Sequence, residues 1–341
     1  MYKSFLNTLS CPRCLGNLKL NEIQNEMDNV TKGSLHCINC HFNFDIEEGV
    51  SIFGLKLDHK EERIKEIKAE NEWTSTANDL QSHINFAMSS SKKGKQIIDY
   101  IEAFDENSMN RRKVLDIGSG WGGCFQAWQF ASRGGYDVTA TEICPEFIFA
   151  SDKVVKECYF ERVITDCTVL PFKDQSFDIV FCKETLHHIN DPKSLLDEIW
   201  RVCSPPNGLI IIKEPCVSSL LKLFITKVNR AARIGITHHF RTSNEYMETI
   251  NDITSNPVIN RESFTKDFRF IRYIPFSDFI NNLSIIILGS DFEVFGIKRT
   301  DYKSEVQVNR EIIPININEL NLAQIKYYRD DLIPEVLKLF Y

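Results

Sequence analysis

Residues 111–216 alternate short apolar runs with helix-forming stretches, and this alternation restricts the possible folds more than any other feature of the chain. Strands that alternate with helices predict βαβ units, a buried parallel sheet and right-handed crossovers. We therefore expect an α/β fold with a doubly wound sheet and a ligand site beside the carboxyl ends of its strands. The five strand-like runs are RRKVLDIG, GGYDVTATEI, ERVITDC, SFDIVFCKE and NGLIIIKEP.

The 341 residues are enough for more than one domain, and the sequence divides into three parts. Residues 1–54 carry paired cysteines and short strand-like pieces, which predict a small separate domain. Residues 55–110 are charged and contain few helix breakers, so we expect a helical linker that caps the next domain. Residues 111–341 form the main domain, with an insertion at about 217–270.

Two CxxC pairs in the first part indicate a metal site. Cys11 and Cys14 form one pair, Cys37 and Cys40 form the other, and 22 residues separate the two pairs. Two turns that each present two thiolates can close the tetrahedral site that Zn²⁺ prefers in structural positions. A segment this small buries little core, so a bound zinc ion explains how it folds. The alternative is four unrelated cysteines.

The charge and the cysteine count narrow the partners and the compartment. The net charge of −7 disfavours a nucleic-acid backbone as the main partner. Eleven cysteines without an apolar leader indicate reduced thiols, and we expect a cytoplasmic protein. We expect no transmembrane segment, because no apolar run approaches the roughly 18 residues that span a bilayer.

The first strand of the main domain runs into a glycine turn. Gly118, Gly120 and Gly123 satisfy the GxGxxG pattern, in which glycine lets the backbone turn tightly and approach a ligand. Dinucleotide-binding enzymes share this pattern, so it does not identify the cofactor by itself.

Carboxylates stand at three successive strand ends. Asp116 lies two residues before the first glycine of the turn, a position that is commonly apolar in dinucleotide sites. Glu142 ends the second strand, where a carboxylate accepts hydrogen bonds from ribose hydroxyls. Asp166 ends the third strand, where an acceptor can receive an adenine amino group. A generic α/β fold with another nucleotide stays the alternative.

The ordered set of motifs resembles the class I S-adenosylmethionine-dependent methyltransferases of type 11, which have a Rossmann-like sheet. The resemblance covers about residues 111–216, and PPNG stands where the family usually has a Pro-Gly-Gly turn. The N-terminal part resembles the small zinc-ribbon (Trm112-like) domains that activate partner methyltransferases. The motifs are VLDIGSGWG, TATE, TDCTVLPF, SFDIVFCKETLHHINDP and LLDEIWRVCSPPNGLIIIKEP.

The resemblance implies S-adenosylmethionine as cofactor and assigns it residues at the strand ends. The methionine part would lie beside Asp116, Gly118, Ser119 and Gly120, the ribose on Glu142, the adenine beside Ile143, Asp166 and Cys167, and the carboxylate or sulfonium near Lys183.

Two residues after the fourth strand are candidates for catalysis. Methyl transfer is an in-line displacement, and a general base is needed only if the acceptor loses a proton near the transition state. His187 is our candidate base, because histidine titrates near neutral pH, and Glu184 is a second candidate. The alternative is that Leu186–Ile189 packs and caps a helix.

Three functions fit these features. We expect a methyltransferase that acts on a small-molecule acceptor in a biosynthetic pathway. The alternatives are a ribosomal-RNA base methyltransferase with a zinc-ribbon docking domain, and a catalytically silent scaffold. Within the insertion, Ser218–Gly235 forms a basic amphipathic pattern that suits a substrate lid, a peripheral contact with an anionic membrane, or an ordinary solvated helix.

Overall fold

A computed structural model describes residues 1–76, 80–104, 111–120, 124–219, 221–222, 239, 241–263 and 289–338. Most of the predicted basic helix Ser218–Gly235 lies outside the described residues, as does Gly123.

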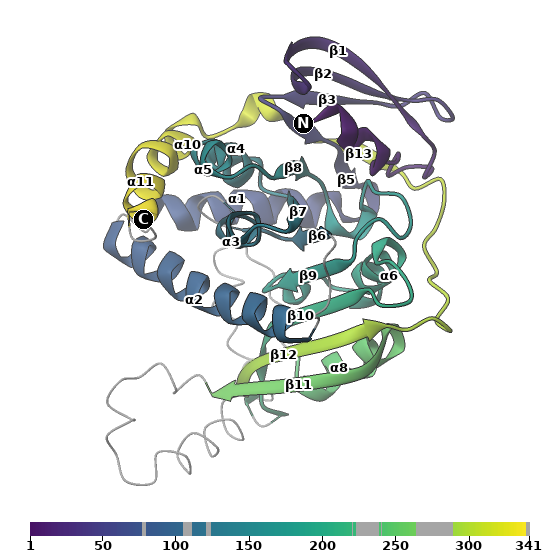
Figure 1. Ribbon diagram of the computed structural model, residues 1–341, viewed down its shortest axis with the longest axis vertical. Coiled ribbons are helices and arrows are strands. Elements are labelled where there is room, and N and C mark those ends of the chain that lie inside the picture. The colour runs from purple at the N-terminus through teal and green to yellow at the C-terminus, as the bar shows by residue number, and fades with distance from the viewer. Residues whose placement is uncertain are drawn as a thin grey trace.

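One mixed sheet of eleven described strands forms the centre of the molecule (Figure 1). Its order is β1-β2-β3-β4-β8-β7-β6-β9-β10-β12-β11. The five middle strands are β8, β7, β6, β9 and β10, and neighbours among them run parallel. They correspond to the five strand-like runs that the sequence predicted. Their bounds are β6 Arg112–Ile117, β7 Tyr136–Glu142, β8 Glu161–Ile164, β9 Ile179–Lys183 and β10 Leu209–Val217.

The strand order reverses between β6 and β9, which makes their carboxyl ends the switch point of a doubly wound sheet. The predicted α/β fold is therefore confirmed. Two antiparallel strands extend the sheet beyond β10: β12 pairs with β10, and β11 pairs with β12. Their bounds are β11 Thr254–Ser263 and β12 Gly289–Lys298.

Strand β6 buries apolar side chains on both sides, because helices cover both faces of the sheet. Val114 and Leu115 are neighbours on β6, yet they belong to different cores. Val114 packs with residues of α2, α3, α4 and α11, whereas Leu115 packs with residues of α6 and α8. Two further helices, α5 and α10, contact α4 and lie on the same face. The bounds of the helices are α2 Leu80–Phe104, α3 Phe125–Arg133, α4 Pro145–Ala150, α5 Asp152–Glu157, α6 Pro192–Val202, α8 Ser243–Ile253, α10 Leu322–Tyr327 and α11 Ile333–Leu337.

The N-terminal strands continue the main sheet instead of forming a separate one. The last of them, β4, pairs in parallel with β8, so that Ser51 lies opposite Val163 and Ile52 opposite Ile164. The predicted border at residue 54 falls just after this pairing. The pairing covers an edge of β8 that would otherwise expose unpaired backbone groups. The strands are β1 Leu18–Glu26, β2 Asn29–Cys37, β3 Asn43–Glu47 and β4 Val50–Ile52.

Helix α1, Lys60–Thr76, follows the N-terminal strands by way of the short strand β5, Gly54–Lys56. The segment predicted as a helical linker thus contains α1 and α2. Contacts of α1 with Asp166 and with the turn after β9 place it at the carboxyl edge of the sheet.

The segment after β12 runs along the side of the molecule to the N-terminal strands (Figure 1). There, strand β13, Ile312–Pro314, pairs with β5, and the amide of Arg310 donates to the carbonyl of Arg13, 2.9 Å away. Nη1 of Arg310 also donates to Oε1 of Glu198 on α6, 2.8 Å away. This segment, for which the sequence predicted no role, ties the N-terminal strands to the main domain.

Among the described residues, none of the helices combines the length and the apolar character that crossing a bilayer requires.

The contact between the N-terminal part and the main domain predicts an effect of mutation on the free energy of unfolding. Phe172 is fully buried, with ring centroids 6.3 Å from Phe5 of the N-terminal part and 4.9 Å from Phe177. We expect Phe172→Ala to lower the free energy of unfolding by about 3–5 kcal/mol, because the variant leaves a cavity. Urea denaturation measures this value. Met27→Ala, at a side chain that is 95% exposed, should change it by less than about 0.5 kcal/mol. Equal effects of the two variants would contradict the prediction.

Candidate functional site

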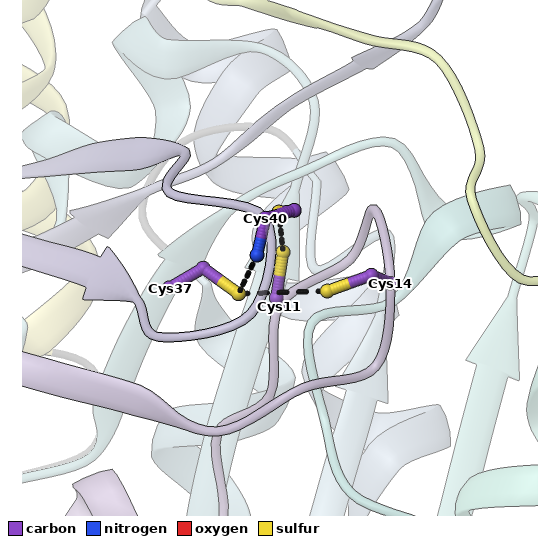
Figure 2. A group of neighbouring side chains, drawn as sticks. All are labelled: Cys11, Cys14, Cys37 and Cys40. Carbon is purple, nitrogen blue, oxygen red and sulfur yellow. Dashed lines mark hydrogen bonds between the residues drawn. The ribbon is translucent and has the colours of Figure 1, made fainter.

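The four cysteines predicted to bind zinc converge on one point (Figure 2). Their sulfur atoms all lie within 4.8 Å of one another, with Cys11 and Cys40 3.6 Å apart and Cys14 and Cys37 3.4 Å apart. A tetrahedral zinc ion with bonds of about 2.3 Å needs sulfur atoms roughly 3.8 Å apart. The donor set and its spacing therefore fit a four-thiolate zinc site without a position for water.

Two equivalent turns build this cluster. In each, the residue after the second cysteine, Leu15 or His41, has a positive φ and donates its amide to the carbonyl of the first cysteine. The amide of Cys40 also points to Sγ of Cys37, 3.5 Å away (Figure 2). All eleven cysteines lie in the described part of the chain, and none of them forms a disulfide bond there.

The glycine turn after β6 fits only glycine at its first position. Gly118 has φ +65°, and a Cβ there would lie 2.1 Å from Oγ1 of Thr185. Gly120 has φ +70°, and among the described residues a Cβ there would meet only the carbonyl of Gly118 within 4 Å. Between them, the amide of Ser119 donates to the carbonyl of Thr141 on β7, 2.9 Å away. The turn is thus held against β7, and its two glycines present backbone without side chains at the carboxyl edge of the sheet.

Asp116 is buried at the end of β6 with an unsatisfied oxygen. Its Oδ2 has no hydrogen-bond partner among the described residues. Burial raises the pKa of Asp116 to about 7, although Ser119 and the charge of Lys183 oppose the rise. A buried acceptor without a partner is costly, and such an atom fits a ligand that brings a charged donor.

Glu142 joins the ends of β6 and β7. Its Oε2 accepts the amide of Gly120 at 2.9 Å, and its Oε1 accepts the amides of Ile143 at 2.7 Å and Cys144 at 3.0 Å. Burial still raises the pKa of Glu142, since the three hydrogen bonds only partly offset desolvation. Because each carboxylate oxygen can accept two hydrogen bonds, Oε2 keeps one acceptor position for a ligand hydroxyl.

Asp166 follows β8, and the protein uses both of its oxygens. Oδ1 accepts the amide of Thr168 at 2.9 Å and its hydroxyl at 2.8 Å, while Oδ2 lies 3.4 Å from the amide of Lys56 and 3.7 Å from Nε of Arg63. Its contact with adenine stays a prediction, as do those of its neighbour Cys167 and of Ile143.

An ionic cluster that the sequence did not reveal holds α1 over this edge. Arg63, 2% exposed, donates to Oε2 of Glu66 at 2.7 Å and to the carbonyl of His188 at 3.2 Å. Oε1 of Glu66 lies 2.8 Å from Nδ1 of His188. Burial opposes the charge on His188, but Glu66 outweighs it and holds the pKa of His188 above its usual value. Glu70, one turn further along α1, has a pKa raised to about 7 by burial and by the nearby Glu142 and Glu66.

The two candidate catalytic residues lie together just after β9. Glu184 has φ +51°, a strained conformation for a residue with a side chain, and its Oε1 is 3.6 Å from Nζ of Lys183. Nδ1 of His187 lies 2.7 Å from Oε2 of Glu214, which is fully buried on β10. The ring of His187 packs against that of His188, with centroids 4.1 Å apart.

Four side chains of this site were not predicted from the sequence: Arg63, Glu66, Glu70 and Glu214. The three residues of α1 share a helix face at spacings of three and four residues, which is a visible signal. Glu214 follows four apolar residues and Lys213 in the strand LIIIKEP, where a carboxylate near the end of a buried strand also stands out. Neither signal shows which partner the side chain meets.

The glycine turn, the strand-end carboxylates and the switch point together define a cofactor-binding α/β domain of the doubly wound type. Comparison with known families agrees: residues 115–212 match the model of the methyltransferase domain, and residues 3–49 match the model of Trm112p-like proteins. The chain therefore contains a segment that is similar to methyltransferase domains, preceded by a segment that is similar to Trm112p-like proteins.

Individual relatives match only part of the chain. Phosphoethanolamine N-methyltransferase 1 of Zea mays is 30% identical over 31% of this chain and 21% of its own length. Norajmaline N-methyltransferase of Rauvolfia serpentina is 27% identical over 33% of this chain and 39% of its own length. The chain thus spans less than half the length of these curated relatives. A solved Haemonchus contortus phosphoethanolamine N-methyltransferase 2 with S-adenosyl-L-methionine is 18% identical, with a TM-score of 0.43, over 60% of this chain and 52% of that one.

The cysteine cluster predicts a stoichiometric metal. We expect purified protein to contain about one zinc per chain by elemental analysis and Cys37→Ser to lose it, with a lower thermal unfolding temperature. Cys158→Ser is the matched control, since Cys158 is a free thiol outside the cluster, and it should keep the metal. Wild-type protein that stays metal-free when zinc is supplied would contradict the prediction.

The burial of Asp116 predicts a dependence of stability on pH. Between about pH 4 and pH 7 the folded protein retains a proton on Asp116 that the unfolded chain releases, so stability falls as the pH rises. Asp116→Asn removes this penalty, and near pH 8 its free energy of unfolding should exceed that of the wild type by ~2–4 kcal/mol. Near pH 4 the two should be similar. Asp137→Asn, at the exposed start of β7, should show no such gain.

Proposed function

We propose that this protein is an enzyme that transfers the methyl group of S-adenosylmethionine to a small-molecule acceptor. The observation that carries the proposal is Oδ2 of Asp116, a buried acceptor without a described partner, beside a bare glycine turn at the switch point. The charged amino group of the cofactor's methionine part is a donor that suits this oxygen. The same residues lie within the matched methyltransferase domain.

The remaining cofactor contacts follow from the strand ends. The open acceptor position on Oε2 of Glu142 suits a ribose hydroxyl. Lys183 carries a positive charge near Asp116 that suits the cofactor's carboxylate. The proposed binding residues are Asp116, Gly118, Ser119, Gly120, Glu142, Ile143, Asp166, Cys167 and Lys183.

When bound, the cofactor supplies an activated methyl group on sulfur. The protein's part is to align the acceptor with that group and, where the acceptor carries a proton, to remove it. His187 and Glu184 stand at the carboxyl edge where the acceptor would enter, and we assign His187 as the base.

A small acceptor is favoured over RNA for two reasons. The net charge of −7 disfavours a polyanionic partner. The relatives named above are N-methyltransferases of phosphoethanolamine and norajmaline. We assign the zinc a structural role, because four thiolates fill its coordination sphere. Described cysteines without disulfide bonds suit a reducing compartment such as the cytoplasm.

Calorimetry with S-adenosylmethionine tests the cofactor assignment. We expect micromolar binding, weakened at least about tenfold in Glu142→Ala, which loses a charged hydrogen-bond acceptor. Asp137→Ala changes the opposite end of the same strand and should bind like the wild type. Absence of binding to the wild type would reject the assignment.

Transfer of a labelled methyl group tests the acceptor class. Phosphoethanolamine, a secondary-amine alkaloid and ribosomal RNA should be supplied separately with the labelled cofactor. Label in a small molecule supports the proposal, whereas label in the RNA alone would replace it with the RNA-methyltransferase function.

A further inference from the structure

Glu214 accepts several hydrogen bonds from the turn after β9. It lies on β10 and is fully buried. Its Oε1 accepts the amides of Thr185 at 2.8 Å and Leu186 at 2.7 Å, and its Oε2 accepts the amide of His187 at 3.2 Å. Three successive amides of the turn after β9 thus point at one carboxylate. Since both oxygens accept N–H groups, Glu214 is a hydrogen-bond acceptor throughout this turn.

The fourth donor is the side chain of His187. Its Nδ1 lies 2.7 Å from Oε2 of Glu214, the shortest contact that this oxygen makes. Because the carboxylate accepts, Nδ1 must carry the proton, and in the neutral ring the lone pair is then on Nε2. A general base takes a proton on its unprotonated nitrogen, so the contact fixes Nε2 as the atom of His187 that can accept one.

The neighbouring histidine has a different role. His188 pairs with Glu66 of α1, which also pairs with Arg63. That pairing joins the turn to a helix from another part of the chain. Glu214 meets no side chain other than His187 within hydrogen-bond distance among the described residues. The two adjacent histidines therefore use separate carboxylates, one that holds α1 and one that orients a ring.

We propose that Glu214 is the positioning residue that holds His187 in its Nδ1–H tautomer and balances the positive charge on the ring when Nε2 accepts a proton from the methyl acceptor. This inference rests on the proposed function. As the acceptor's lone pair forms the new bond to the methyl carbon, the carbon–sulfur electron pair returns to sulfur, and the acceptor's proton moves to Nε2. A buried carboxylate beside the ring stabilises the resulting imidazolium.

Glu214→Gln changes the tautomer in a defined direction. Two amides donate to Oε1, so the oxygen of glutamine should stay at that position and its NH₂ should face His187. The NH₂ then donates to Nδ1, and the ring must carry its proton on Nε2.

Long-range ¹H–¹⁵N spectra of histidine-labelled protein measure this without any acceptor, with His187→Gln assigning the signal. We expect the Nδ1–H form in the wild type and the Nε2–H form in Glu214→Gln. Glu66→Gln, the matched change at the other histidine's carboxylate, should leave His187 in the Nδ1–H form. An Nε2–H ring in the wild type, or the same tautomer in the wild type and Glu214→Gln, would overturn the proposal.

Rates of methyl transfer give the second measurement. With an acceptor that bears a proton, Glu214→Gln should lower kcat about a hundredfold while binding of S-adenosylmethionine changes less than twofold. Glu214→Gln combined with His187→Gln should be no slower than His187→Gln alone, because Glu214 acts through that ring. Multiplying effects would overturn the proposal. If the wild type binds no S-adenosylmethionine, the proposed function fails, and the spectra still decide whether Glu214 sets the tautomer.

Discussion

The parallel pairing of β4 with β8 is the contact on which the arrangement of this protein depends. It joins the Trm112p-like strands to the methyltransferase sheet as one hydrogen-bonded surface. Because β5 and α1 follow directly, the pairing also delivers α1 to the carboxyl edge of the sheet. Arg63 then reaches Asp166, and Glu66 reaches His188. The N-terminal part therefore helps to build the carboxyl edge of the sheet as well as to extend the sheet.

The segment after β12 secures the same junction from the other end of the chain. Its strand β13 pairs with β5, and Arg310 joins a turn of the cysteine cluster to Glu198. Glu198 also accepts the amide of Leu170 at 2.8 Å and pairs with Arg201, so this buried carboxylate is fully used by the protein. Structural carboxylates of this kind contrast with Asp116, which keeps an oxygen without a described partner.

The buried carboxylates at the carboxyl edge of the sheet fall into the same two kinds, those whose oxygens the protein itself uses and one that keeps an oxygen for a proposed ligand. Glu214 and Asp166 are buried and satisfied by backbone donors and side chains. Asp116 is also buried, but its Oδ2 has no partner in the part of the chain that the structure describes, and burial raises its pKa to about 7. The cost of a buried acceptor without a partner persists where a bound ligand offsets it.

The local features could be predicted from the sequence: the βαβ alternation, the glycine turn, the strand-end carboxylates and the two CxxC pairs. Each depends on residue type and short spacing, which act within a few residues along the chain. Which distant groups meet became visible in the folded chain alone. The β4–β8 pairing, Arg63 on Asp166 and Glu214 on His187 join residues 27 to 112 positions apart. Backbone edges and single charged side chains carry no sequence pattern that names their partners, so packing alone selects them.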